Sequence, residues 1–259
     1  MSVPVTAAGD LRRLVVRDLR RDMRVLDGLI VNTALPVIIM VLFVYVFGGA
    51  ITTGSSGLAY IDFVVPAVLL MSGGYGAALT AVTIAEDLSG GMIDRFRTLP
   101  ISGWVVPAGH VVASVIRNVA SSAIALAAAL LLGFRPDASL ADWALVLALV
   151  TGYVLAMSAL AAVWGLLVSS PQAAGAFSFF VLFLPYVSDG IVPAQTMPGV
   201  LREFAYNQPL TPIIETMRSL LLGLPMGSSG AVATAWLAGT VALCVPVAAM
   251  LFRRRTASR

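Results

Sequence analysis

Six apolar stretches, each close to membrane length, alternate with polar stretches along the 259 residues of the chain. A bilayer core about 30 Å thick is crossed by a helix of about 20 apolar residues. Strands of a membrane barrel are shorter and alternate in polarity. The pattern predicts an all-α integral membrane protein with a single domain, 1–259, and six transmembrane helices, at 29–47, 63–85, 105–132, 143–168, 173–188 and 231–252.

The composition agrees with a membrane location and excludes several kinds of chemistry. The chain is 59% hydrophobic and 11% charged, whereas soluble domains carry about 25% charged residues. Its basic residues are all Arg, so it has neither the Lys of a P-loop nor a Lys for Schiff-base chemistry. One Cys and one His exclude a disulfide and a Cys-based metal site.

The distribution of Arg predicts how the chain is oriented. Twelve Arg residues fall in the N-terminal segment, the loop at 86–103 and the C-terminus, against three in the outer loops. Because cytoplasmic loops carry the excess of Arg and Lys, both termini and the 86–103 loop are predicted to be cytoplasmic. The all-Arg usage is typical of a high-GC bacterial genome, so the membrane is expected to be the bacterial cytoplasmic (inner) membrane.

The loop at 86–103 is rich in charged residues, contains glycines and lies between two predicted spans. It mixes acids and bases within a few residues: Glu86, Asp87, Asp94, Arg95 and Arg97. Two interpretations are open, a topological spacer and a docking site for another protein; the mixed charge and the rigid Leu99-Pro100 step favour docking.

Residues 10–27 predict an amphipathic helix. Its basic strip, on one face at helical spacing, comprises Arg13, Arg17, Arg20 and Arg24. Such a helix next to a span usually lies in the membrane interface, with Arg toward anionic lipid head groups. Asp18 and Asp22 project into the apolar side, however, and lipid phosphate would repel them. Part of the helix is therefore expected to contact protein.

Two polar residues fall near the inner end of the third span. Arg117 is placed about one turn inside the membrane, where it either snorkels or forms a structural ion pair, or else acts in coupling or gating. His110 falls outside the hydrocarbon core and is expected to be an interfacial polar residue.

Two stripes at helical spacing are candidates for a substrate path. The second span carries Met71, Tyr75 and Leu79, flanked by glycines that allow close approach of another helix; the fifth carries Phe179, Phe183 and Tyr186. The alternatives are packing within one subunit and contact with lipid. A path lined by both stripes favours a two-fold dimer, since the uncharged spans enclose no polar channel.

The stretch 189–230 is too apolar for an aqueous loop and too broken for a span. Thr211 followed by Pro212 predicts a helix start, and Gly223 follows the expected helix 213–222. Ten residues rise only about 15 Å, so the helix is expected to be re-entrant or interfacial on the outer side. Glu215 and Arg218, three residues apart, are expected to neutralise each other.

The chain lacks an energy source of its own. It has no catalytic residue set, no metal-ligand spacing and no glycine-rich phosphate loop, and its spans lack the buried acids of ion-coupled carriers. The Arg strip is not interleaved with stacking aromatics, so nucleic acid is not an expected partner. A membrane domain with a charged cytoplasmic loop suits a transport subunit driven by a separate ATPase.

Three stretches carry a family resemblance: 86–102, Gly133-Phe134-Arg135-Pro136, and 207–212 continuing to Arg218 and Gly223. In this order and spacing the chain resembles the permease subunit of type-2 ATP-binding-cassette (ABC) exporters, among them daunorubicin-resistance-like drug efflux pumps of actinobacteria, which confer antibiotic resistance. Relatives typically lack Gln208 in the third stretch.

The resemblance implies a dimer of permease subunits, homodimeric or heterodimeric, bound to two copies of an ABC ATPase that carries ATP and Mg²⁺. It implies that 86–103 forms a cytoplasmic coupling helix, that 10–27 is the interfacial connecting helix, and that substrate passes between spans two and five. The outer region would hold a gate with Asn207, Glu215 and Arg218. The expected cargo is a hydrophobic or amphipathic compound, a drug-like natural product or a lipid. An ion-coupled secondary transporter and a non-transporting membrane assembly factor are the alternatives.

Overall fold

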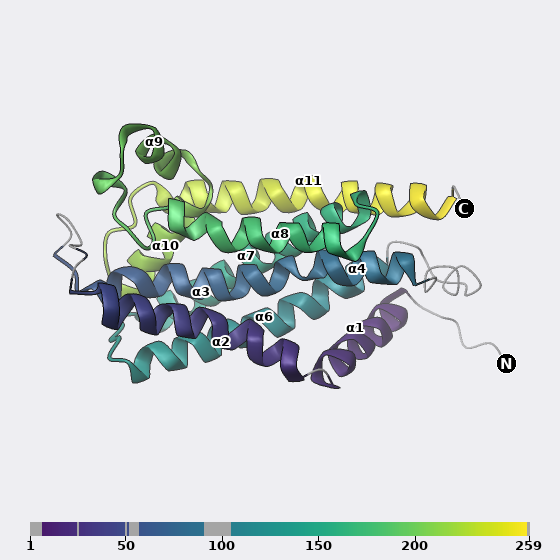
Figure 1. Cartoon of the computed structure of the whole chain (residues 1–259), viewed down its shortest axis with the longest axis horizontal. Coiled ribbons are helices and arrows are strands. Elements are labelled where there is room, and N and C mark those ends of the chain that lie inside the picture. Colours follow the sequence, from purple (N-terminus) through teal and green to yellow (C-terminus); the bar gives the residue numbers. More distant parts are fainter. Residues whose placement is uncertain (1–6, 25, 50, 52–56, 91–104, 258–259) are drawn as a thin grey trace.

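The computed structural model describes residues 7–24, 26–49, 51, 57–90 and 105–257, and these residues form helices joined by turns (Figure 1). An elongated bundle contains most of them: α2 (Leu26–Leu42) with a π-helical continuation η1 (Phe43–Phe47), α3 (Tyr60–Ala78), α4 (Thr80–Ser89), α6 (Val105–Leu131), α7 (Leu140–Leu167), α8 (Pro171–Phe183) and α11 (Ser229–Ala257). Shorter elements are α1 (Ala7–Arg24), η3 (Leu184–Val187), η4 (Ala194–Thr196), α9 (Gly199–Asn207) and α10 (Leu210–Leu222).

Four helical segments among the described residues are long and apolar enough to cross a bilayer. They are α3 with α4 (Tyr60–Ser89), α6, α7 and most of α11 (Ser229–Arg255). The helices at the predicted first and fifth spans have shorter apolar segments, Ala34–Phe47 and Pro171–Val187. The structure therefore confirms a multi-pass, helical membrane protein, and crossings at 29–47 and 173–188 remain predictions.

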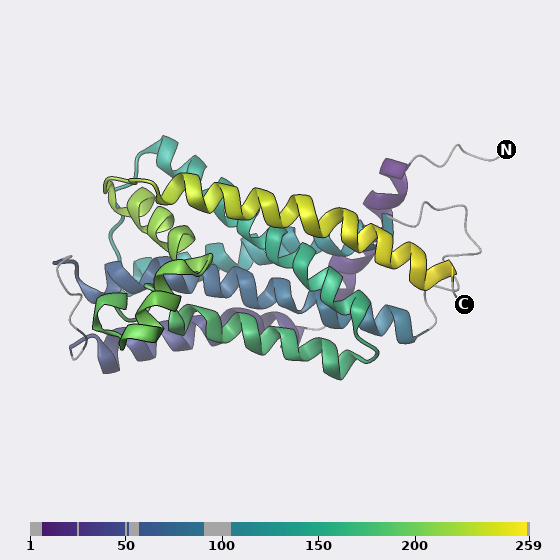
Figure 2. The ribbon, with the colours of Figure 1, turned by 90° about the horizontal axis from the view of Figure 1, so that it is seen from above.

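The two ends of the bundle carry different elements (Figures 1 and 2). Helix α1 lies at an angle to the bundle, at the same end as the C-terminal ends of α4 and α11. Helices α9 and α10 lie at the opposite end. This arrangement is the one the Arg distribution requires, with the N-terminal helix, the second loop and the C-terminus on one side.

Helix α3 is the centre of the core, and nearly all of its side chains are buried. Glycines on α3 let α7 approach closely: a Cβ at Gly74 would lie 2.5 Å from Tyr153 Oη, and one at Gly73 would lie 2.9 Å from Val154 Cγ2. Two of the glycines predicted to allow close approach of another helix thus face α7 of the same chain, which agrees with the alternative of packing within one subunit. Ala at either position would require the Tyr153 or Val154 side chain to shift.

Helix α4 continues the direction of α3 after a break at Leu79, and it packs against α7 and α8. The contact with α7 is close, because a Cβ at Gly165 would lie 2.5 Å from the backbone oxygen of Ala81. Asp87 and Glu86 lie in the last turn of α4, immediately before the 91–104 segment, which is outside the described residues. The packing of α4 thus fixes where these two acids stand.

The turns between helices agree with their sequence signals. Ser170 caps α8 through its side chain, which accepts a hydrogen bond from Ala173 N at 3.2 Å, and Pro171 follows at the first helical position. The chain therefore makes a tight hairpin between α7 and α8. Gly223 ends α10 in the left-handed conformation, with φ of 62°, as its position predicted.

Candidate functional site

A cluster of six charged side chains joins α1, α4 and α6 at the end of the bundle next to the 86–103 loop. It contains three cations and three carboxylates: Arg17, Asp18 and Arg21 from α1, Glu86 and Asp87 from α4, and His110 from α6. We call this set the charge cluster.

His110 stands at the centre of the cluster, with its side chain 3% exposed. Its Nδ1 lies 2.9 Å from Asp18 Oδ2, and its Nε2 lies 3.1 Å from Asp87 Oδ2. A neutral imidazole would turn one lone pair toward a carboxylate, whereas an imidazolium presents a proton to each. Two carboxylates at these distances favour a charged His110, and the expectation of an interfacial polar residue is corrected to a buried residue between two acids.

Two arginines of α1 complete the links to α4. Arg17 Nη2 lies 2.7 Å from Asp18 Oδ1 and 3.4 Å from Asp87 Oδ2. Arg21 Nη2 lies 2.7 Å from Glu86 Oε2, and its Nη1 lies 3.5 Å from Asp87 Oδ1. The Asp87 carboxylate thus lies within ion-pair distance of His110, Arg17 and Arg21, and these three residues compensate the cost of burying its charge.

The pKa of Asp18 shows which influence prevails at α1. Burial raises the pKa of this carboxyl. Hydrogen bonding and charge from His110 and Arg17 together lower the pKa by more than burial raises it, so the net shift is downward. A depressed folded-state pKa means that the ionised form stabilises the fold above the usual Asp range. That contribution is lost as the pH falls through the lowered pKa, so it is complete at neutral pH.

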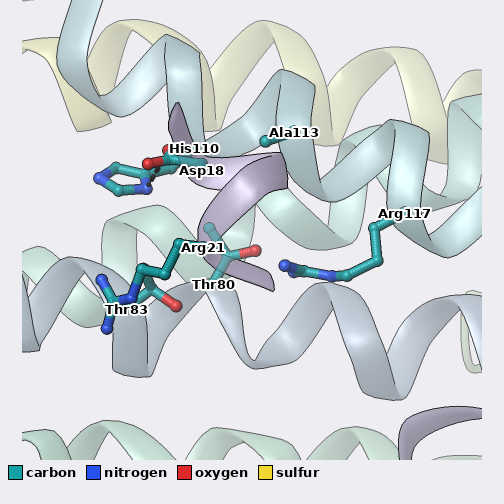
Figure 3. Close-up of a pocket in the computed structure, with 7 residues that line it drawn as sticks. All are labelled: Asp18, Arg21, Thr80, Thr83, His110, Ala113 and Arg117. Carbon is teal, nitrogen blue, oxygen red and sulfur yellow. Dashed lines mark ion pairs between the residues drawn. The ribbon is translucent and has the colours of Figure 1, made fainter. Parts of the chain in front are cut away.

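A small polar hollow of about 10 Å³ adjoins the cluster, with room for about one water molecule (Figure 3). Arg21, His110 and Arg117 line it together with Thr80 and Thr83 of α4. Figure 3 shows Arg117 extending from α6 toward Thr80, so Arg117 lies beside the charge cluster. This position keeps open both alternatives stated for Arg117, a structural contact and a part in coupling.

The residues predicted to couple the chain to an ATPase fall into two groups. Glu86 and Asp87 belong to the charge cluster and pair with residues of the same chain. Asp94, Arg95 and Arg97 lie outside the described residues. Their docking role therefore stays a prediction.

The four Arg residues of the predicted interfacial strip on α1 do not all face the same way in the structure. Arg13 and Arg20 are exposed, as a lipid-facing strip requires, whereas Arg17 turns toward the cluster; the side chain of Arg24 lies outside the described residues. Sequence reasoning missed Arg21 and His110. The available signal was Asp18, an acid on the apolar side of a basic helix.

At the opposite end, Arg218 of α10 is buried against α3 and the segment after α8. Its Nη1 lies 3.3 Å from Asp189 Oδ2, and its Nη2 donates to Asp189 O at 2.7 Å and to Phe63 O at 3.2 Å. The guanidinium also lies 4.0 Å from the centre of the Phe63 ring. Asp189 is the close acidic partner of Arg218, and Glu215 also interacts with Arg218 through its charge.

The start of α10 also differs from the prediction. The helix begins at Leu210 after Pro209, and Thr211 is not its cap. The Thr211 hydroxyl instead donates to Ala205 O at the end of α9. Asn207, the other predicted gate residue, donates from Nδ2 to Glu203 O at 2.8 Å.

The two candidate substrate-path stripes have different exposures. Met71 is buried and Tyr75 and Leu79 are half-buried, whereas Phe179 and Phe183 are 66% and 60% exposed. Tyr186 is half-buried and packs against Phe183 at a centroid distance of 6.1 Å. The structure thus leaves the α8 stripe open to lipid or a second subunit, and the path itself is untested. Among the described residues no group of His, Cys, Asp and Glu fits a metal ion.

Comparison with known proteins decides the family. The sequence pattern of ABC-2 type transporters matches residues 10–222, from α1 through α10. The chain belongs to the ABC-2 type transporter family. This permease is 29% identical over 226 residues to a daunorubicin resistance ABC transporter permease protein of Streptomyces coeruleorubidus, covering 86% of this chain and 78% of the relative.

A second relative covers still more of the permease. It is a probable doxorubicin resistance ABC transporter permease protein of Mycobacterium tuberculosis, 25% identical over 244 residues, which cover 93% of this chain and 86% of the relative. The permease is accordingly the transmembrane subunit of an ABC exporter, and the prediction from the sequence is confirmed.

Proposed function

We propose that this permease moves a hydrophobic or amphipathic compound, a drug-like natural product or a lipid, outward across the bacterial cytoplasmic membrane. Its relatives are named for resistance to daunorubicin and doxorubicin, which supports a drug as the cargo. ATP and Mg²⁺ are bound by a separate ATPase subunit, since the chain contains no P-loop lysine.

The charge cluster is the observation that supports coupling between the ATPase and the membrane helices. It ties α1 and α6 to the last turn of α4, which leads directly into the 91–104 segment. A displacement of that segment by a bound ATPase would therefore reach three helices at once. Asp94, Arg95 and Arg97 are the residues proposed to contact the ATPase, while Glu86 and Asp87 relay the contact into the membrane domain.

The proposed assembly is a two-fold pair of permease subunits with two ATPase subunits. Phe179 and Phe183 support it, because a contiguous exposed aromatic stripe on α8 suits a partner helix or a bound substrate. A path between α3 and α8 of the two subunits would place Tyr75 and Leu79 opposite this stripe.

The proposed topology has six spans, cytoplasmic termini, and α9 and α10 on the outer side. The shared end of α1, α4 and α11 supports it, together with the Arg distribution. With 13 residues, α10 rises about 20 Å, which is too short to cross.

Reversing a charge in the loop is expected to release the ATPase. Arg95→Glu or Asp94→Arg should lower the amount of ATPase that co-purifies with the permease by about tenfold or more, because like charges would face each other at the interface. Thermal unfolding of the permease should be unchanged, as is usual for substitutions on a loop surface. The matched control is Arg254→Glu, which reverses an exposed Arg at the same end of the bundle. Full retention of the ATPase and of export in the variant with both changes would exclude loop docking.

Cysteine labelling is expected to show that α10 does not cross. After Cys244→Ala, single cysteines at Tyr206 and Leu224, which flank α10 and are 46% and 40% exposed, should both react from outside the cell with an impermeant maleimide. A cysteine at Arg253 should react only after the membrane is permeabilised. If the two flanking positions label from opposite sides, α10 spans the membrane and the proposed topology is wrong.

A further inference from the structure

A cavity of about 520 Å³ is lined by α7, α10 and α11, by Phe180 of α8, by Leu184 of η3 and by the end of α9. Phe179 and Phe183 do not line it. Pockets for drug-sized ligands have volumes of about 300–1,000 Å³. The cavity is therefore large enough for a small amphipathic molecule.

The lining of this cavity is apolar and carries no charge. Leu160 of α7, Phe180 of α8, and Trp236 and Leu243 of α11 supply much of the wall, and none of the lining side chains is ionic. A phospholipid or an ionic drug would bring a charge that this lining cannot balance. The chemistry of the wall thus favours a neutral occupant.

One lining residue, Gln208, offers an unused hydrogen-bond acceptor. Its side chain is buried, with 4% of the residue exposed, and Nε2 donates to Val187 O at 2.9 Å. Its Oε1 is buried and has no hydrogen-bond partner within the described part of the chain. Buried amide oxygens are rarely left without a donor in native proteins. A donor is therefore expected to arrive from outside the chain.

We propose that the cavity is a binding site for a neutral amphipathic molecule that donates a hydroxyl or amine hydrogen bond to Gln208 Oε1. The apolar body of the molecule fills the space between α7, α8 and α11, and the donor sits beside the α9–α10 turn. The inference rests on the proposed function in one respect, because it takes the occupant from the class of compound that the permease exports. The site is separate from the proposed path between subunits, which uses Phe179 and Phe183.

A matched pair of fluorescent probes tests the proposal. 1-Pyrenebutanol has a neutral apolar body and a hydroxyl donor, and its methyl ether lacks only the donor. Each is titrated into the purified permease in phosphatidylcholine nanodiscs, with empty nanodiscs as the blank. Energy transfer from tryptophan to pyrene is measured in a background with Trp104→Phe, Trp143→Phe and Trp164→Phe, so that it reports on Trp236, which lines the cavity.

We expect saturable transfer with the alcohol and about fivefold weaker binding of the ether, the factor expected for one neutral hydrogen bond. Gln208→Met, of similar size, should remove the preference for the alcohol. Thr240→Leu adds bulk inside the cavity and should weaken both probes, whereas Ala242→Leu, at an exposed position of α11 outside the cavity, should change neither.

Equal affinity of the two probes in this background would overturn the proposal, and this comparison needs no substitution in the cavity. Unchanged binding in Thr240→Leu would also overturn it. Brominated phosphatidylcholine that quenches Trp236 and displaces both probes would assign the cavity to lipid chains instead. The test can fail independently of the proposed function. If the ATPase co-purifies but no probe binds, only this inference is wrong. If the probes bind but no ATPase co-purifies, only the proposed coupling is wrong.

Discussion

Replacing His110 by Leu is expected to destabilise the permease by about 3 kcal/mol and to abolish export. The variant leaves Asp18 and Asp87 buried without the cation between them, and breaking a buried ion pair in this way costs about 3–5 kcal/mol. The lower end of that range applies because Arg17 and Arg21 continue to compensate Asp87. Thermal unfolding in detergent, followed by loss of helical circular dichroism, measures the destabilisation.

A second variant separates the fold from coupling. Combining His110→Leu with Asp18→Asn removes one buried charge of each sign, so it should recover much of the stability while α1 remains detached electrostatically from α6. ATP-driven export should stay lost in inside-out vesicles that contain the ATPase. Arg20→Leu, on the exposed face of α1, is the control and should leave both readouts unchanged. Normal stability of the single His110→Leu variant would show that the cluster does not hold α1.

Arg218→Leu is expected to have the second large effect, at the other end of the molecule. Arg218 compensates Asp189 and bonds the backbone of Phe63, so its loss removes this polar link between α10 and α3 and leaves the Asp189 carboxylate with Ala194 N as its donor among the described residues. Loss of a cation from a largely buried pair predicts destabilisation by about 3 kcal/mol. Thermal unfolding in detergent is again the measurement.

Arg202→Leu is the matched control, because Arg202 is an exposed Arg in the same outer region that donates only to Met197 O in the described contacts. Its effect should stay below about 1 kcal/mol, as expected for a surface substitution. Arg218→Lys should recover only part of the stability, because an ammonium cannot reproduce the planar fork that reaches both Asp189 and Phe63. If Arg218→Leu were as stable as the unmodified permease, this ion pair would not anchor α10.

The helices were predictable from the sequence because long uninterrupted apolar runs have few alternatives in a bilayer. The start of α8 carries two local sequence signals, the cap side chain of Ser170 and Pro171 at the first helical position. The start of α10 was misassigned at Thr211, since its hydroxyl is used by the end of α9. A cap motif reports only neighbouring backbone, and a tertiary acceptor can compete for the same side chain.

The ionic contacts were the least predictable part. Helical spacing suggested Glu215 for Arg218, but Asp189 reaches it from another element. His110 has apolar neighbours in the sequence, and nothing local shows that Asp18 and Asp87 meet it in space. Long-range pairs of this kind depend on how the helices cross, which hydropathy does not encode. The acid on the wrong side of α1 indicated a protein contact without naming its partner.

The division of α1 into a buried and an exposed charged face has a consequence for its response to ionic strength. Salt screens exposed charges over about 10 Å at 0.1 M and screens buried pairs much less. We therefore expect the exposed Arg13 and Arg20 to attract anionic lipid in a salt-dependent way, whereas the pairs through His110 should persist. Raising the salt concentration is expected to weaken the binding of α1 to the membrane surface while leaving α1 attached to α4 and α6.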